Sequence, residues 1–226
     1  MTVIRFTIGD AFPATDPVAR FITGLAMISN DWLRSLDDMF RLDGDTPEEV
    51  GRRVSLFRRQ AGLVYEAAAF ITDARRMFPE AASFIDGLEG EARDDCERVI
   101  GAVDSTSRHY LGDWLEQHRN VTHHYPRMHP AAVQHGQEEM ANALAEAADI
   151  ESTIDTGERF GDARFRFADE VGVQLLPDLS DPGWVVALRE TAMALADFAQ
   201  RAARGYLQSR PAGSFIVEPG TDHGTG

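Results

Sequence analysis

Residues 16–40, DPVARFITGLAMISNDWLRSLDDMF, are patterned as one long amphipathic helix. Asp16 stands at the N-cap position and Pro17 at the first helical position, a pair that is typical of a helix start. Large apolar side chains then recur every three to four residues, and this spacing gathers them on one face of a helix. They are Phe21, Leu25, Ile28, Trp32, Leu36 and Phe40. We therefore expect a helix from Pro17 to about Phe40 whose apolar stripe faces a core, and we interpret Met27 and Met39 as packing residues too.

A second long helix is predicted directly after the first. Thr46-Pro47-Glu48-Glu49 combines a threonine cap, a proline at the first helical position and a glutamate at the third, which is the capping-box arrangement. This helix should extend to Phe78, because Pro79 stops it. Its expected core stripe consists of Val50, Val54, Phe57, Ala61, Val64, Ala68 and Ile71.

The remaining pattern indicates a mostly α-helical bundle. Further helices are expected at 80–90, from about 91 to 125 with a break near Gly101, from 130 to about 148, and from Asp181-Pro182 to about Gln208. Residues 150–167 change character, since β-branched and alternating segments flank two glycines, and they predict a small β-hairpin. Residues 3–6 favour a short strand. We expect one helical domain over 1–210 and a disordered Gly- and Pro-rich tail over 211–226.

Composition excludes several classes of function. The net charge is -15 and the sequence pI about 4.8, with all 22 cationic residues being arginine. Such acidity argues against broad, non-specific nucleic-acid binding, which needs a basic face. Cys96 is the only cysteine and stands among acidic neighbours that disfavour a thiolate. No intramolecular disulfide can form, and no leader or membrane-spanning run is present, so we expect a cytoplasmic protein.

The residues with the most chemistry are Arg119-Asn120-Val121-Thr122-His123-His124, followed by Tyr125-Pro126. Arginine is an always-charged phosphate ligand, and histidine can move protons near neutral pH. Residues four apart share a helix face, so a regular helix places His123 above Arg119. His124 reaches the same region only if the helix tightens or frays before Pro126. This content is what cleavage of a phosphodiester would use.

The string Arg119-x4-His124, with Asn120 directly after the arginine, resembles the R-x(4–6)-H motif of HEPN-domain proteins. The resemblance implies an all-helical, dimeric fold and a metal-independent endoribonuclease of a toxin–antitoxin or defence system. It implies that Arg119 binds phosphate, His124 transfers protons and Asn120 supports them, with His123 as the substitute if the helix is regular. A homodimer, an RNA substrate and an antitoxin protein are the partners that it suggests.

Two other interpretations remain open from the residues themselves. Arginine and histidine near a helix C-terminus also stabilise the last carbonyls and the helix dipole, so the motif can be structural. The acidic composition equally fits a non-enzymatic, all-α dimer that binds a small ligand or another protein.

Metal binding and a basic RNA strip receive less support. Six of the seven histidines lie between His109 and His135, but no His-x3-His or His-Glu-x-x-His spacing is present. We therefore expect neither a metal site nor a cofactor. The arginine pairs 52–53 and 58–59 are interpreted as a solvated face paired with acidic residues.

Overall fold

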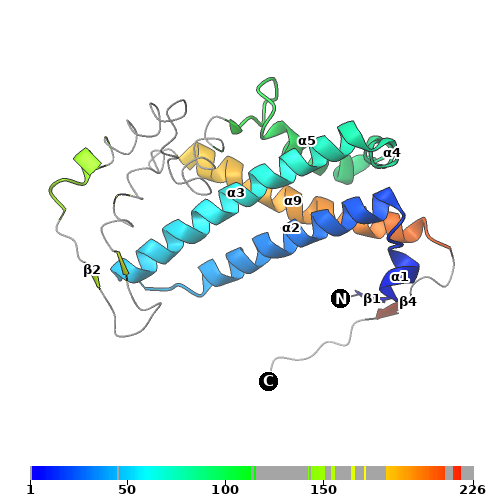
Figure 1. The fold of residues 1–226 in the computed structure, drawn as a ribbon, viewed down its shortest axis with the longest axis horizontal. Coiled ribbons are helices and arrows are strands. Elements are labelled where there is room, and N and C mark those ends of the chain that lie inside the picture. The colour runs from blue at the N-terminus through cyan, green and yellow to red at the C-terminus, as the bar shows by residue number, and fades with distance from the viewer. Residues whose placement is uncertain are drawn as a thin grey trace.

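The protein is mostly α-helical, and three long helices form its framework. The computed structural model describes residues 2–44, 46–112, 115, 142, 144–150, 154–155, 164–165, 171, 182–211 and 216–219. Helix α2 (Pro17–Phe40) runs antiparallel to α3 (Pro47–Met77), and α9 (Pro182–Gln208) lies alongside both (Figure 1). These bounds confirm the three helices that the sequence predicts. None of the described helices has the length and apolar character needed to cross a bilayer.

Local capping explains why α2 and α3 begin where they do. The Asp16 carboxylate accepts hydrogen bonds from the backbone N–H groups of Val18 at 2.8 Å and Ala19 at 3.3 Å. The predicted capping box of α3 is also present: Thr46 Oγ1 accepts from the Glu49 N–H, and Glu49 Oε2 accepts from the Thr46 N–H, both at 3.3 Å. Each cap satisfies backbone donors that the first helical turn leaves without partners.

Two shorter helices return the chain along the framework. Helix α4 (Pro79–Asp86) begins immediately after Phe78, the C-cap of α3, and α5 (Gly90–Gly101) follows it. Gly90 has φ +56°, a left-handed conformation that only glycine adopts at little cost. Helix α5 packs against α9 and α3.

The helix expected from about 91 to 125 ends at Gly101, where the sequence indicated a break. Turns replace it, and the Leu111 N–H donates to the carbonyl of Ala102 at 2.9 Å, so the chain folds back on itself. Asp104 helps to end the helix, because its carboxylate accepts from the backbone N–H of Thr106 at 2.9 Å. Such side-chain bonds to nearby backbone compete with helical hydrogen bonding.

Short strands join segments that are distant in sequence. Strand β1 (Thr2–Arg5), followed by the one-turn helix α1 (Ile8–Ala11), pairs antiparallel with β4 (Ile216–Pro219), with Arg5 opposite Ile216. The segment 211–226, expected to be a disordered tail, thus contributes a strand. The difference arises because Ile216-Val217, which have high strand propensity, pair in register with Arg5 and Ile4 of the N-terminal strand. Within the segment where a hairpin was predicted, β2 (Ile154–Asp155) pairs antiparallel with β3 (Arg164–Phe165).

The buried core of the described residues falls into two clusters. The larger one lies where α2 begins and α3 and α9 end, and includes Phe21, Leu25, Ile71, Val99 and Phe198. Small residues of α3 and α9 let the helix backbones approach closely around these large side chains. They are Ala67, Ala68, Ala199 and Ala202. The smaller cluster lies further along the bundle and includes Trp32, Val64, Leu115 and Leu188.

The predicted core stripes of α2 and α3 are buried over only part of their length. Trp32 is 4% exposed, as expected. The prediction was wrong for Phe40 and Val50, which are 78% and 39% exposed, and for Met27, which is 64% exposed. Phe40 and Val50 lie where α2 ends and α3 begins, beyond the described core, and Met27 points away from it. Periodicity identifies an apolar face, but it does not show how far along the helix a neighbour covers that face.

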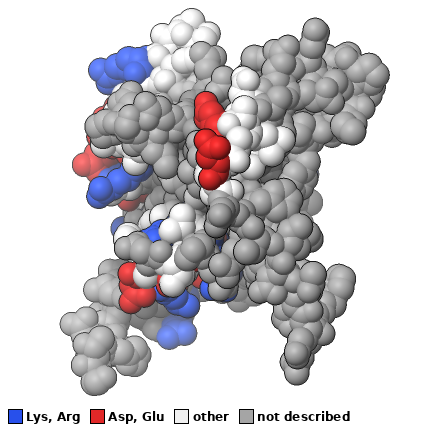
Figure 2. Space-filling view, turned by 90° about the vertical axis from the view of Figure 1, so that its left-hand side faces the viewer, with Lys and Arg blue, Asp and Glu red and all other residues white. Residues whose placement is uncertain are grey.

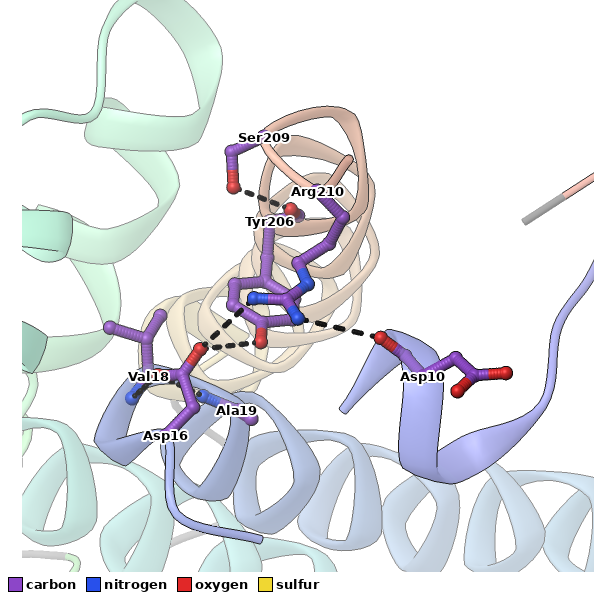
Figure 3. Close-up of polar contacts among 7 residues, drawn as sticks. All are labelled: Asp10, Asp16, Val18, Ala19, Tyr206, Ser209 and Arg210. Atoms are coloured by element: carbon purple, nitrogen blue, oxygen red, sulfur yellow. Dashed lines mark hydrogen bonds and ion pairs between the residues drawn. The ribbon is translucent and has the colours of Figure 1, made fainter. Parts of the chain in front are cut away.

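A polar clamp, formed by Asp16, Tyr206 and Arg210, ties the start of α2 to the end of α9 (Figure 3). The Tyr206 hydroxyl donates to Asp16 Oδ2 at 2.7 Å, and Arg210 Nη1 lies 3.6 Å from the same oxygen. Arg210 also donates to the carbonyl of Asp10 at 3.4 Å. The Tyr206 ring stacks on Phe12, with centroids 5.3 Å apart. The clamp therefore joins both ends of the chain to one corner of the bundle.

The clamp shifts the pKa values of its members in opposite directions. Burial raises the pKa of Asp16, but the Tyr206 hydroxyl, the amides of Ala19 and Val18 and the Arg210 charge together lower it below its ordinary 3.8. Burial, with the hydrogen bond to Asp16, raises the pKa of Tyr206 from 10 to about 12. The stabilisation from Asp16 is therefore present above pH 3.8 and is lost as the pH falls through its folded pKa.

Two substitutions of Asp16 distinguish its contribution to stability as the N-cap of α2 from its contribution to the clamp. Asp16→Asn keeps a good N-cap but weakens the contacts to Tyr206 and Arg210, whereas Asp16→Ala removes both. We expect Asp16→Ala to lower the free energy of unfolding by about 2–3 kcal/mol and Asp16→Asn by about 1 kcal/mol. Urea denaturation at pH 7 measures both, and equal effects of the two variants would contradict this division.

Ionisation of Tyr206 makes the contribution of the clamp to stability depend on pH in the alkaline range. Since the folded pKa is raised, the stabilisation is complete below pH 10 and is lost as the pH rises towards about 12. Tyr206→Phe should cost about 1–3 kcal/mol at pH 7, and the difference from wild type should shrink between pH 10 and 12. Denaturant midpoints across this range test it; a difference independent of pH would show that the hydroxyl is not bound to a carboxylate.

Candidate functional site

A groove of about 640 Å³ lies between the second half of α2, the first half of α3 and the first half of α9. We call it the α2–α3–α9 groove. Its wall is mainly apolar and includes Trp32, Leu36, Phe40, Phe57, Val185 and Met193. Several of these side chains are the exposed continuation of the core stripes. The groove therefore exists because α2 and α3 carry their apolar faces beyond the length that the described core fills.

Two buried hydrogen-bond donors belong to the wall of this groove. Trp32 is 4% exposed and Gln60 is 8% exposed, and both line the groove. Among the described residues, neither Trp32 Nε1 nor Gln60 Nε2 has a hydrogen-bond partner, and neither atom has accessible surface. An unsatisfied buried donor costs about 1–3 kcal/mol, so such groups in a folded protein require an explanation.

Charged side chains stand at the rim. Arg189 is exposed and makes no ion pair with any other described residue, although it belongs to the groove lining. Asp197 also reaches the lining, but its carboxylate lies 3.9 Å from Arg201 Nη1. Arg201 in turn binds Asp95 and, at 2.6 Å, Glu91, both of α5. Among the described lining residues, Arg189 therefore carries a positive charge that no described carboxylate neutralises.

A smaller cavity of about 250 Å³ lies between α2 and α3 at the other end of the bundle. It is lined by Phe21, Phe70 and Phe78, with Arg20 and Asp73 at its edge. The rings of Phe21 and Phe70 stack with centroids 5.7 Å apart and occupy much of this region. Ligand pockets usually measure about 300–1,000 Å³, so the α2–α3–α9 groove has the size of a ligand site and this cavity does not.

The predicted catalytic residues Arg119, Asn120, His123 and His124 lie outside the described residues. The nearest described residue before them is Leu115, which is fully buried. Its N–H donates to the Leu111 carbonyl at 2.8 Å. Leu115 belongs to the same core cluster as Trp32 and Leu188, which also line the α2–α3–α9 groove. The described chain leading to the motif is thus anchored beside the groove.

His109 is the one member of the histidine cluster that falls in the described part. Arg108 Nε donates to His109 Nε2 at 3.1 Å, so that nitrogen is an acceptor and the ring is neutral. Burial lowers the pKa of His109, and the charges of Arg98 and Arg108 lower it further. Among the described residues, no group of three or more histidine, cysteine, aspartate or glutamate side chains is placed to hold a metal ion.

Several described arginines are bound to nearby carboxylates or carbonyls. Arg41, Arg76 and Arg93 each pair with a carboxylate on their own helix. Arg53, one of the four arginines near the start of α3, donates to the Gly44 carbonyl at 2.6 Å. Figure 2 looks at the end where α2 ends and α3 begins, where both blue and red groups are visible among the described residues.

Comparison with known proteins returns no relative: no family model matches the chain, and no curated protein or solved structure shows significant similarity to it.

Neither periodicity nor any motif reveals the groove or the residues that define its chemistry. Gln60 falls on the buried side of α3, and Val185, Arg189 and Met193 lie on the last helix, but no sequence pattern marks them as ligand-binding residues. No local signal could have found them, because the groove depends on how three helices meet. The only available hint was that the α2 stripe continues to Phe40, the last residue of the helix.

Cys96 is a structural residue and not a nucleophile. Its side chain is 3% exposed, and burial raises the pKa of its thiol to about 12. We expect native protein at pH 8 to resist labelling by a thiol reagent and to react stoichiometrically in denaturant, because the thiolate is the reactive form. Rapid labelling of native protein, at the rate of a free cysteine, would contradict the burial.

Proposed function

We propose that this chain is a HEPN-like helical protein that cleaves RNA without a metal ion. The observation that carries the proposal is the string Arg119-Asn120-x3-His124, which matches the R-x(4–6)-H pattern together with its accompanying asparagine. The mostly α-helical framework supports it, since that fold class is the one the resemblance requires.

The proposed chemistry divides between two side chains. His124 takes the proton of a ribose 2′-hydroxyl, and the 2′-oxygen attacks the adjacent phosphorus as the bond to the leaving 5′-oxygen breaks. Arg119 holds the phosphate and the negative charge that grows on it, and Asn120 orients these groups. The products are a 2′,3′-cyclic phosphate and a free 5′-hydroxyl, which recovers a proton. Two copies of the chain would form one cleft, and a protein antitoxin would cover it.

Substitution of the motif tests this proposal directly. Arg119→Ala and His124→Ala should each reduce RNA cleavage by about 10²-fold or more, in buffer that contains EDTA. His123→Ala should retain activity if His124 is the acid–base, and the reverse result would assign the role to His123. His129→Ala is the matched control and should cleave at the wild-type rate. Wild-type protein without cleavage at high concentration would contradict the ribonuclease proposal.

A second candidate function is non-enzymatic ligand binding by an all-α dimer. The specific observation in its favour is the α2–α3–α9 groove, which combines a ligand-sized volume, a mainly apolar wall and the exposed Arg189. Binding there does not require Arg119 or His124, so Arg119→Ala would leave it intact. The two functions are therefore separable by experiment.

A further inference from the structure

We propose that the α2–α3–α9 groove binds a carboxylic acid with an unbranched apolar chain, a ligand of the fatty-acid class. The inference rests on the second proposed function and deepens it by naming the ligand. It is independent of whether the chain cleaves RNA.

The volume and the apolar wall of the groove indicate that part of the ligand is a hydrocarbon chain. The cavity of about 640 Å³ lies in the range of small-molecule sites. Phe40 is 78% exposed and Met193 is 50% exposed, although both line the groove. A bound hydrocarbon chain would remove these surfaces from water, and each buried CH₂ favours binding by the hydrophobic effect.

The Gln60 amide supports a polar group in the ligand. Gln60 Nε2 has no accessible surface and no acceptor among the described residues, and an N–H donor cannot use a cation. The terminal torsion of a glutamine side chain is broad, so the Gln60 amide can turn its N–H groups towards an oxygen in the groove at low cost. An acceptor-bearing ligand would then give this amide a partner, whereas a purely apolar ligand or an apolar helix face would not.

The charge at the rim distinguishes a carboxylate from a neutral acceptor. Arg189 is exposed at the lining and is not neutralised by any described residue, and Arg–carboxylate pairs are the stronger, charge-assisted kind. Asp197, the other charged residue among the described lining, lies 3.9 Å from Arg201 Nη1 and belongs to the ion-pair group that Arg201 forms with Glu91 and Asp95. A carboxylate can therefore pair with Arg189 while its chain lies along the aromatic wall.

Three probes of equal chain length test the proposal on the full-length protein after removal of bound lipid. Decanoate, 1-decanol and decylamine are titrated by isothermal calorimetry. Decanoate should bind at least about tenfold more tightly than 1-decanol, and decylamine most weakly, because charge-assisted hydrogen bonds are roughly twice as strong as neutral ones. Arg189→Ala should reduce the affinity for decanoate about tenfold and leave that for 1-decanol unchanged.

Two further variants locate the binding. Arg204→Ala, an exposed arginine on the same helix outside the lining, is the matched control and should bind decanoate as wild type does. Ala196→Trp places a large ring in the groove and should abolish binding of both probes. Gln60→Leu should weaken decanoate binding, and its thermal midpoint shows whether it is folded.

The outcomes separate the two levels of the proposal. Equal affinity for decanoate and decylamine, or equal effects of Arg189→Ala and Arg204→Ala, would overturn the carboxylate assignment while ligand binding stands. Binding that survives in Ala196→Trp would overturn the location. Absence of binding for all three probes would overturn both this inference and the ligand-binding function.

Discussion

The Asp16 carboxylate is the constraint on which the arrangement of the helices depends. It satisfies the free N–H groups at the start of α2 and, with its other oxygen, accepts the Tyr206 hydroxyl at 2.7 Å, 190 positions later in the chain. One side chain thus fixes where α2 begins and where α9 ends. Because Arg210 binds both Asp16 and the Asp10 carbonyl, the segment before α2 is held at the same corner. The pairing of β1 with β4 lies beyond these contacts and joins the two ends of the chain.

Fixing the helices at one end has a consequence at the other. Next to the clamp, alanines of α3 and α9 allow close approach, and the large side chains of α2 fill the remaining space. Towards the end of α2 the same three helices carry larger side chains, such as Phe40, Phe57 and Met193, and these line a groove. A close-packed interior would leave no such space, so its presence separates a structural end of the bundle from an end that is open to a ligand.

Local sequence predicted the helices well because their limits are encoded locally. The Asp16-Pro17 pair, the capping box at Thr46 and the stop at Pro79 each act within one helical turn, and the structure confirms all three. What the sequence did not show depends on residues far apart. Periodicity does not identify contacts between residues that are far apart in the chain. Such contacts determine the bond from Tyr206 to Asp16, the strand at Ile216 and the exposure of Phe40. The groove belongs to this second kind, whereas the Arg119–His124 motif lies outside the described residues and remains a prediction.

Both proposed sites require a protein of net charge -15 to attract an anion. The net charge does not forbid this, because fields in physiological salt decay over about 8 Å and local pairing decides the outcome. Arg98 and Arg201 are neutralised by carboxylates across the α5–α9 contact, so they offer little to a ligand. Arg189 has no such partner among the described residues, which makes it a better anion ligand than arginines in pairs. The same criterion applies to Arg119: it can hold a phosphate only if no carboxylate of this acidic chain already occupies its guanidinium.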